Sequence, residues 1–180
     1  DLQKSYGANL ELTHELREKV KELEGKDRIA QHLLTIHTLD ETLEMVLEVI
    51  SETIKLDQGV VYLKKPGGFS PAAAIGIARE EALQHLEPSP LHRDAFKSAE
   101  DLLAPVNIEE TRDAAIPPFA VVPVVRGAKC LGLIEVNRRS SGGAFREQEL
   151  GTLSSFALQV AVAISDAETQ GNFEEWQDHL

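Results

Sequence analysis

Residues 119–137 read FAVVPVVRGAKCLGLIEVN. Apolar and β-branched residues fill both halves, and Arg126-Gly127-Ala128 between them has the composition of a tight turn. The pattern predicts a β-hairpin. Pro123 cannot donate a hydrogen bond to a neighbouring strand, so we expect it at an edge, at a bulge or at a non-bonded position.

A second hairpin is predicted earlier in the chain. Residues 60–63 are β-branched, aromatic or aliphatic, residues 66–68 read PGG, and residues 69–75 return as a strand of mostly small side chains. No parallel βαβ series is evident. The two hairpins are therefore expected to join into a single antiparallel layer.

Two long helices should back this layer. Thr38 and Glu41 have the spacing of a capping box, and a wide apolar face follows them through about residue 55. Phe145 precedes the other helix and is expected to pack on Leu150 as a hydrophobic staple. Apolar residues continue to Ile164 on more than one side of that helix, which indicates more than one neighbour.

The middle and the end of the chain have weaker patterns. Residues 76–118 predict short helices at 80–86 and 91–97, followed by an acidic loop, and such segments are usually functional covers or disordered insertions. The acidic residues 168–180 are expected to be a loosely attached helix or a frayed end.

The first residues predict a helix that pairs with a second copy. Leu16, Val20 and Leu23 have four-three spacing, typical of a coiled-coil seam, and Gly25 is expected to interrupt the helix. The alternative is a lone amphipathic helix packed on its own domain. We therefore divide the chain into an N-terminal helix (1–25), a main domain (26–167) and a tail (168–180).

Composition narrows the possible partners. The chain has 180 residues, 42% hydrophobic and 27% charged, and a formal net charge of −12, which disfavours nucleic acid as a partner. Its apolar runs are shorter than the roughly 20 residues of a membrane span, so direct membrane insertion is not expected. A single cysteine, Cys130, cannot form an internal disulfide and fits a reducing cytosol.

Three strings in this order resemble the GAF domain, a sensory module of signalling proteins. They are residues 38–54 with the strand at 60–63, the hairpin at 119–137, and FREQEL at 145–150 leading into residues 157–164. The resemblance implies an α/β (α+β) fold with a central antiparallel sheet of about five or six strands, long terminal helices on one face and short helices or loops over the other, as in GAF and PAS domains. Arg146 stands where the family usually has a threonine or serine cap, so this helix start is expected to be looser.

The resemblance also implies a function. A GAF module binds a small molecule, unidentified here, and relays the change through its terminal helices in a homodimer to covalently linked signalling domains. The alternative is a ligand-free dimerisation or spacer module. Residues 1–6 are similar to the last turn of a HAMP linker, which implies a cytoplasmic domain tethered to the inner membrane through an upstream segment.

In such folds the ligand pocket lies on the sheet face opposite the long helices. Strand alternation places one group of side chains on that face, and the covering segment adds three more. The predicted lining is Tyr62, Phe119, Val121, Leu133 and Glu135 from the strands, with His92, Arg93 and Phe96 from the cover. The same residues could instead form a second small core, and a strand parity shifted by one would exchange the two faces.

No cofactor is evident from the sequence. The cyclic-nucleotide signature of the family is incomplete. Asn137 and Phe145 match it, but Arg138 replaces the lysine, Glu149 replaces the aspartate and Leu150 replaces the final acid.

Other cofactors and catalysis are equally disfavoured. Cys130 lies in an apolar strand, which favours a structural thiol over a bilin attachment point. His85 and His92 lack the partners that a haem site needs, and no histidine pair has metal-ligand spacing. No catalytic constellation occurs, so we do not expect an enzyme.

Overall fold

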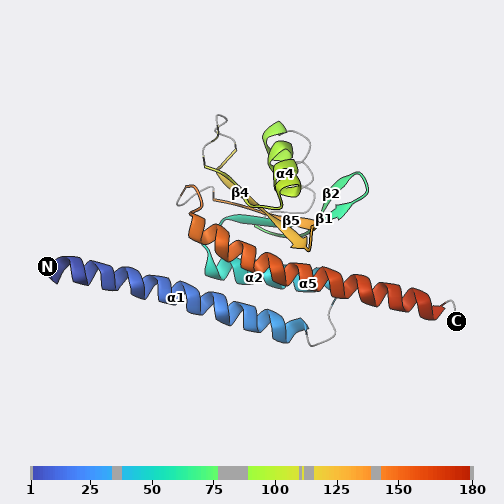
Figure 1. Cartoon of the computed structure of the whole chain (residues 1–180), viewed down its shortest axis with the longest axis horizontal. Coiled ribbons are helices and arrows are strands. Elements are labelled where there is room, and N and C mark those ends of the chain that lie inside the picture. The colour runs from blue at the N-terminus through green and yellow to red at the C-terminus, as the bar shows by residue number, and fades with distance from the viewer. Residues whose placement is uncertain are drawn as a thin grey trace.

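The computed structural model describes residues 2–33, 38–76, 89–109, 111, 116–138 and 143–178. Within them, a five-stranded sheet carries two helices on one face and one on the other, and a further long helix forms an outer layer (Figure 1). The helices are α1 (Leu2–Leu33), α2 (Leu39–Thr53), α4 (Pro90–Leu102) and α5 (Glu147–Asp178), and the strands are β1 (Gln58–Lys65), β2 (Gly68–Ile75), β3 (Val106–Ile108), β4 (Phe119–Arg126) and β5 (Lys129–Asn137).

The sheet joins the two predicted hairpins into one antiparallel layer, in the order β2-β1-β5-β4-β3. The junction is between β1 and β5, where Tyr62 lies opposite Leu133. On its other side, Leu133 lies opposite Pro123 of β4. The strand β3 pairs with Phe119–Val121 of β4 and ends before Pro123. Among the described residues, Pro123 therefore has a strand neighbour on one side only, which fits a residue without a backbone N–H.

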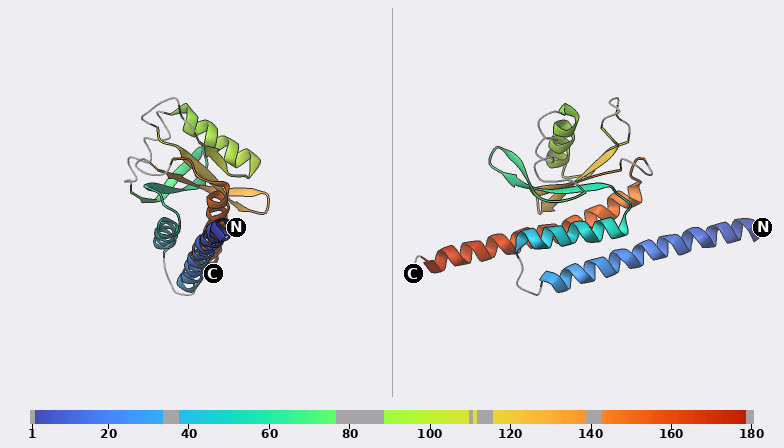
Figure 2. Two further views of the ribbon diagram at one scale, coloured as in Figure 1. Left: turned by 90° about the vertical axis from the view of Figure 1, so that its left-hand side faces the viewer. Right: turned by 180° about the vertical axis from the view of Figure 1, so that it is seen from behind.

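The main core fills the space between the sheet and the helices α2 and α5. Thr38 caps α2 as predicted, because its hydroxyl accepts a hydrogen bond from the Glu41 backbone N–H at 3.2 Å. The apolar face of α2 is buried against this core, and so are Phe145 and Phe156. Figure 2 shows α4 on the opposite side of the sheet from α2 and α5.

The helix α1 runs through Gly25 without a break, so the predicted interruption is wrong. A Cβ atom at Gly25 would lie 2.4 Å from Cγ1 of Val49 in α2 and 3.5 Å from the Phe156 ring in α5. Glycine therefore stands here because two helices approach its backbone closely.

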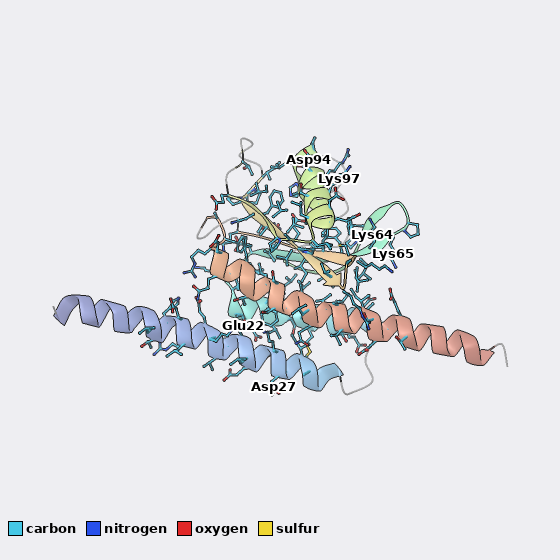
Figure 3. All side chains as sticks on the ribbon, in the orientation of Figure 1. Glu22, Asp27, Lys64, Lys65, Asp94 and Lys97 are labelled. Atoms are coloured by element: carbon cyan, nitrogen blue, oxygen red, sulfur yellow. The ribbon has the colours of Figure 1, made fainter. Side chains whose placement is uncertain are left out.

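The predicted coiled-coil residues of α1 lie on a different face of the helix from Gly25. Leu16, Val20 and Leu23 are 64%, 50% and 55% exposed, so α1 does not use them to pack on its own domain. Instead, Glu22, Gly25 and Ile29 are buried. In Figure 3, Glu22 lies on the side of α1 toward α2.

Glu22 is held by two lysines of its own helix. Its carboxylate pairs with the Lys19 ammonium at 3.1 Å and with that of Lys26 at 3.2 Å. Burial alone would raise the pKa of Glu22, but these two ammonium groups lower it below its ordinary value.

Two further elements differ from the predictions, and the tail takes the helical one of its two predicted forms. The helix predicted at 91–97 is longer, as α4, and β3 lies in the segment predicted as a loop. The helix α5 continues to Asp178, and its stretch Glu147–Thr169 is apolar enough to cross a membrane, although part of it is buried on the sheet. The predicted helix at 80–86 and His85 lie outside the described residues.

Candidate functional site

The predicted pocket residues come together under α4. We call this group the α4 cluster: an apolar set of Val60, Tyr62, Ala95, Phe96, Ala99, Phe119, Val121 and Leu133, with the polar residues His92 and Glu135. The predicted strand parity is therefore correct. Arg93 is the exception, because its side chain is exposed. It follows His92 directly in α4, so it points about 100° away from His92 around the helix axis.

A polar chain crosses this apolar cluster. The Nε2 atom of His92 lies 3.1 Å from one carboxylate oxygen of Glu135, and the Tyr62 hydroxyl donates to the other oxygen at 3.3 Å. Since these groups come from α4, β5 and β1, the chain ties the helix to two strands. The His92 ring also stacks on Phe119, with centroids 4.2 Å apart and planes at 11°.

The local backbone positions His92. Ser89 caps α4, and its hydroxyl accepts a hydrogen bond from the His92 backbone N–H at 3.4 Å. The cap places His92 in the first turn of the helix, where its side chain reaches Glu135.

Burial controls the electrostatics of the cluster. It raises the pKa of Tyr62, and the charge of Glu135 and the hydrogen bond to it raise that pKa further. The hydroxyl therefore remains a donor at any physiological pH. Such polar groups in an apolar setting are costly unless they are hydrogen-bonded, and they provide the orienting contacts that a small ligand uses.

The cluster is closed among the described residues. Tyr62, Phe119, Val121 and Leu133 are at most 1% exposed, and the rings of Tyr62 and Phe96 lie 5.1 Å apart. A ligand among these side chains would have to displace α4 from the sheet. The described side chains thus form a second small core around a polar chain.

The residues of the incomplete cyclic-nucleotide signature lie elsewhere. Arg138 is buried, pairs with Glu149, donates to the Lys55 carbonyl at 2.6 Å and lies 4.2 Å above the centroid of the Phe145 ring. Glu149 also accepts a hydrogen bond from the Arg146 backbone N–H at 3.0 Å. This carboxylate supplies half of a capping box, so the start of α5 is fastened although Arg146 lacks a capping hydroxyl.

Cys130 shows no feature of a reactive site. It is half-buried, its thiol donates to the Gly132 carbonyl at 3.3 Å, and burial raises its pKa. In the described part of the chain, no group of three His, Cys, Asp or Glu side chains could hold a metal ion.

A charged cavity was missed by the sequence analysis. It has a volume of about 390 Å³ and lies between α1, the end of α2 and the start of α5, on the helical side of the sheet. Its charged lining includes Glu18, Lys21, Lys55 and Arg146. No sequence signal joins these residues, because they belong to three distant segments.

The family model for the GAF domain matches residues 38–164. The chain belongs to the GAF domain family. GAF domains are sensory and regulatory modules. No curated protein matches the chain.

Solved GAF structures share this fold at low sequence identity. The GAF domain of a phosphoenolpyruvate-protein phosphotransferase from Coxiella burnetii is 15% identical with a TM-score of 0.67, covering 85% of this chain and 98% of its own. The corresponding Acinetobacter domain is 21% identical with a TM-score of 0.63, covering 82% and 94%. The GAF domain of a putative sensor histidine kinase from Pseudomonas syringae pv. tomato is 15% identical with a TM-score of 0.65, covering 89% and 97%.

Proposed function

We propose that this GAF domain senses a small molecule that binds between α4 and the sheet. The observation that carries the proposal is the buried polar chain from His92 through Glu135 to Tyr62 inside an otherwise apolar cluster. A ligand with a hydrogen-bonding group and an apolar body would replace the hydrogen bonds of the polar chain and the apolar contacts between α4 and the sheet.

The signal would start as a movement of α4. A ligand shifts the balance between closed and open arrangements only if it binds them with different affinity. Opening separates His92 from Glu135 and leaves a buried carboxylate without one partner, unless the ligand donates in its place. The ligand therefore carries a donor for Glu135. Because β4 and β5 carry α4 on one face and α5 on the other, the shift can reach α5.

We further propose that the terminal helices relay the change across a homodimer. The stripe of Leu16, Val20 and Leu23 on α1 is exposed and has coiled-coil spacing, so a second copy of the same helix is its natural partner. Leu158 and Val162 on α5 are 63% and 48% exposed and would extend this interface.

We also propose a cellular setting for this domain. The GAF domain is the cytoplasmic part of a signalling protein, joined covalently to an output domain and held at the inner membrane through an upstream segment. The similarity of residues 1–6 to a HAMP linker supports this setting, and nucleic acid has no part in it.

Native mass spectrometry of the purified protein tests ligand binding. We expect a copurified metabolite whose occupancy falls sharply in Glu135→Gln and in Tyr62→Phe. Glu48→Gln is the matched control, because Glu48 is exposed on α2, on the other face of the sheet. Full occupancy in Glu135→Gln, in a folded protein, would contradict the proposed site.

Light scattering tests the dimer. Burying one leucine side chain is worth about 1.5–3 kcal/mol, so Leu16→Lys with Leu23→Lys should convert the dimer to a monomer. Leu102→Lys changes a leucine that is 72% exposed at the end of α4 and should leave the dimer intact. A protein that stays dimeric with both α1 lysines would remove α1 from the interface.

A ligand-free spacer is the second candidate function. The closed packing of the α4 cluster favours it, since the side chains there already bury one another. If no mass beyond the polypeptide is found and a metabolite library leaves the melting temperature unchanged, the spacer function replaces the sensor.

A further inference from the structure

The charged cavity beside α1 is separate from the α4 cluster. Its walls come from α1, the end of α2, Arg138 and the start of α5, so it lies on the other face of the sheet. At about 390 Å³ it is in the size range of small-molecule sites, roughly 300–1,000 Å³. We call it the junction cavity.

The charge of the junction cavity is opposite to that of the protein. Its lining includes four cationic side chains and two carboxylates, so the lining has a net charge of +2. The whole chain has a net charge of −12. The cationic residues are Lys21, Lys55, Arg138 and Arg146, and the carboxylates are those of Glu18 and Glu149.

The ion pairs of the cavity leave two cations available. Glu149 pairs with Arg138 and Arg146, and Glu18 lies 3.4 Å from the Arg146 guanidinium. Neither Lys21 nor Lys55 has a carboxylate partner within the described part of the chain. Two unpaired ammonium groups at the wall of one cavity attract anions and repel cations.

We propose that the junction cavity binds a small organic dianion, with Lys21 and Lys55 as its charge partners. Arg146 adds a planar fork that suits a phosphate or a carboxylate. The bound anion would bridge α1, the end of α2 and the start of α5, and it would compete with Glu18 for Arg146. Ligand binding here changes how α1 is held on the domain, independently of any ligand under α4.

Titration calorimetry with inorganic phosphate and with succinate, against chloride at matched ionic strength, tests the site. We expect saturable binding of at least one probe, and the tighter probe shows whether the cavity prefers a phosphate or carboxylate groups. Lys21→Gln with Lys55→Gln should weaken that binding about tenfold or more, because each lost charged contact removes a charge-assisted hydrogen bond.

Two controls separate this site from the net charge and from the α4 cluster. Lys65→Gln with Lys97→Gln removes the same charge from exposed positions on the hairpin and on α4 (Figure 3), and it should leave the affinity unchanged. Glu135→Gln should also leave it unchanged, so a failure of the sensor proposal does not affect this result. Equal weakening by both lysine pairs, or no saturable binding of either probe, would overturn the proposal.

Discussion

Replacing Gly25 with alanine should destabilise the protein, although alanine is the better helix former. In a helix interior, alanine is favoured over glycine by about 1 kcal/mol. The new Cβ, however, would lie 2.4 Å from Cγ1 of Val49, well inside the optimal carbon–carbon separation of about 3.5–4.0 Å. Val49 is 1% exposed and β-branched, so it cannot turn away, and α1 must move instead.

The magnitude follows from these opposing terms. Overpacking a core contact costs about 1–3 kcal/mol, so the net destabilisation should be about 1 kcal/mol after the helix-propensity gain. Gly151 is the matched control, because it lies in α5 with open space around its Cβ position. Gly151→Ala should stabilise by about 1 kcal/mol, and the two variants should differ by about 2 kcal/mol.

Urea denaturation followed by circular dichroism measures both variants. In the melting temperature, the difference corresponds to about 4–8 °C for a chain of this size. Adding Val49→Ala to Gly25→Ala should recover part of the loss, with a coupling energy of about 1 kcal/mol or more. If Gly25→Ala stabilises the protein as Gly151→Ala does, α1 is not docked on α2 in solution.

Three further changes test the ends and the charges of the helices. Thr38→Ala removes the cap of α2 and should lower the free energy of unfolding by about 1 kcal/mol in urea; no loss would mean that the hydroxyl is not the cap. Arg138→Met leaves the Glu149 carboxylate buried with one partner fewer and should lower the free energy of unfolding by about 3 kcal/mol in the same assay. A loss smaller than that of Thr38→Ala would count against a buried ion pair. Glu22 has a folded pKa below its ordinary 4.5, so its stabilisation is present above that pH and is lost as the pH falls through the folded pKa. The stability difference between wild type and Glu22→Gln should therefore shrink from pH 7 to pH 3, and a difference independent of pH would refute the pairing.

Short-range patterns predicted most of the elements. Runs of apolar and β-branched residues around turn residues identified both hairpins. Strand alternation then placed Tyr62, Phe119 and Leu133 on the same face, because successive side chains of a strand point to opposite sides. The spacing of Thr38 and Glu41 located the start of α2 for a similar reason, since a cap involves only residues three positions apart. By contrast, β3 has three residues, too few to show any period.

The candidate site was predictable only in part. Strand parity and the position of the covering segment brought His92 and Glu135 together, but not the closed packing around them, which depends on how side chains from α4 fill the space above the sheet. The junction cavity had no signal at all. Its charges become neighbours only when α1, α2 and α5 meet.

Gly25 separates the two kinds of information most clearly. Along the chain, a glycine in a helical pattern indicates a weak point, because its backbone is the most flexible. In the folded protein Gly25 of α1 faces Val49 of α2 and Phe156 of α5. Because glycine has no side chain, the three helices can approach one another at this point. Secondary structure depends mainly on residues that are close in the sequence, so the sequence alone predicts much of it. Contacts between distant segments depend on the shapes that those segments have once they are folded.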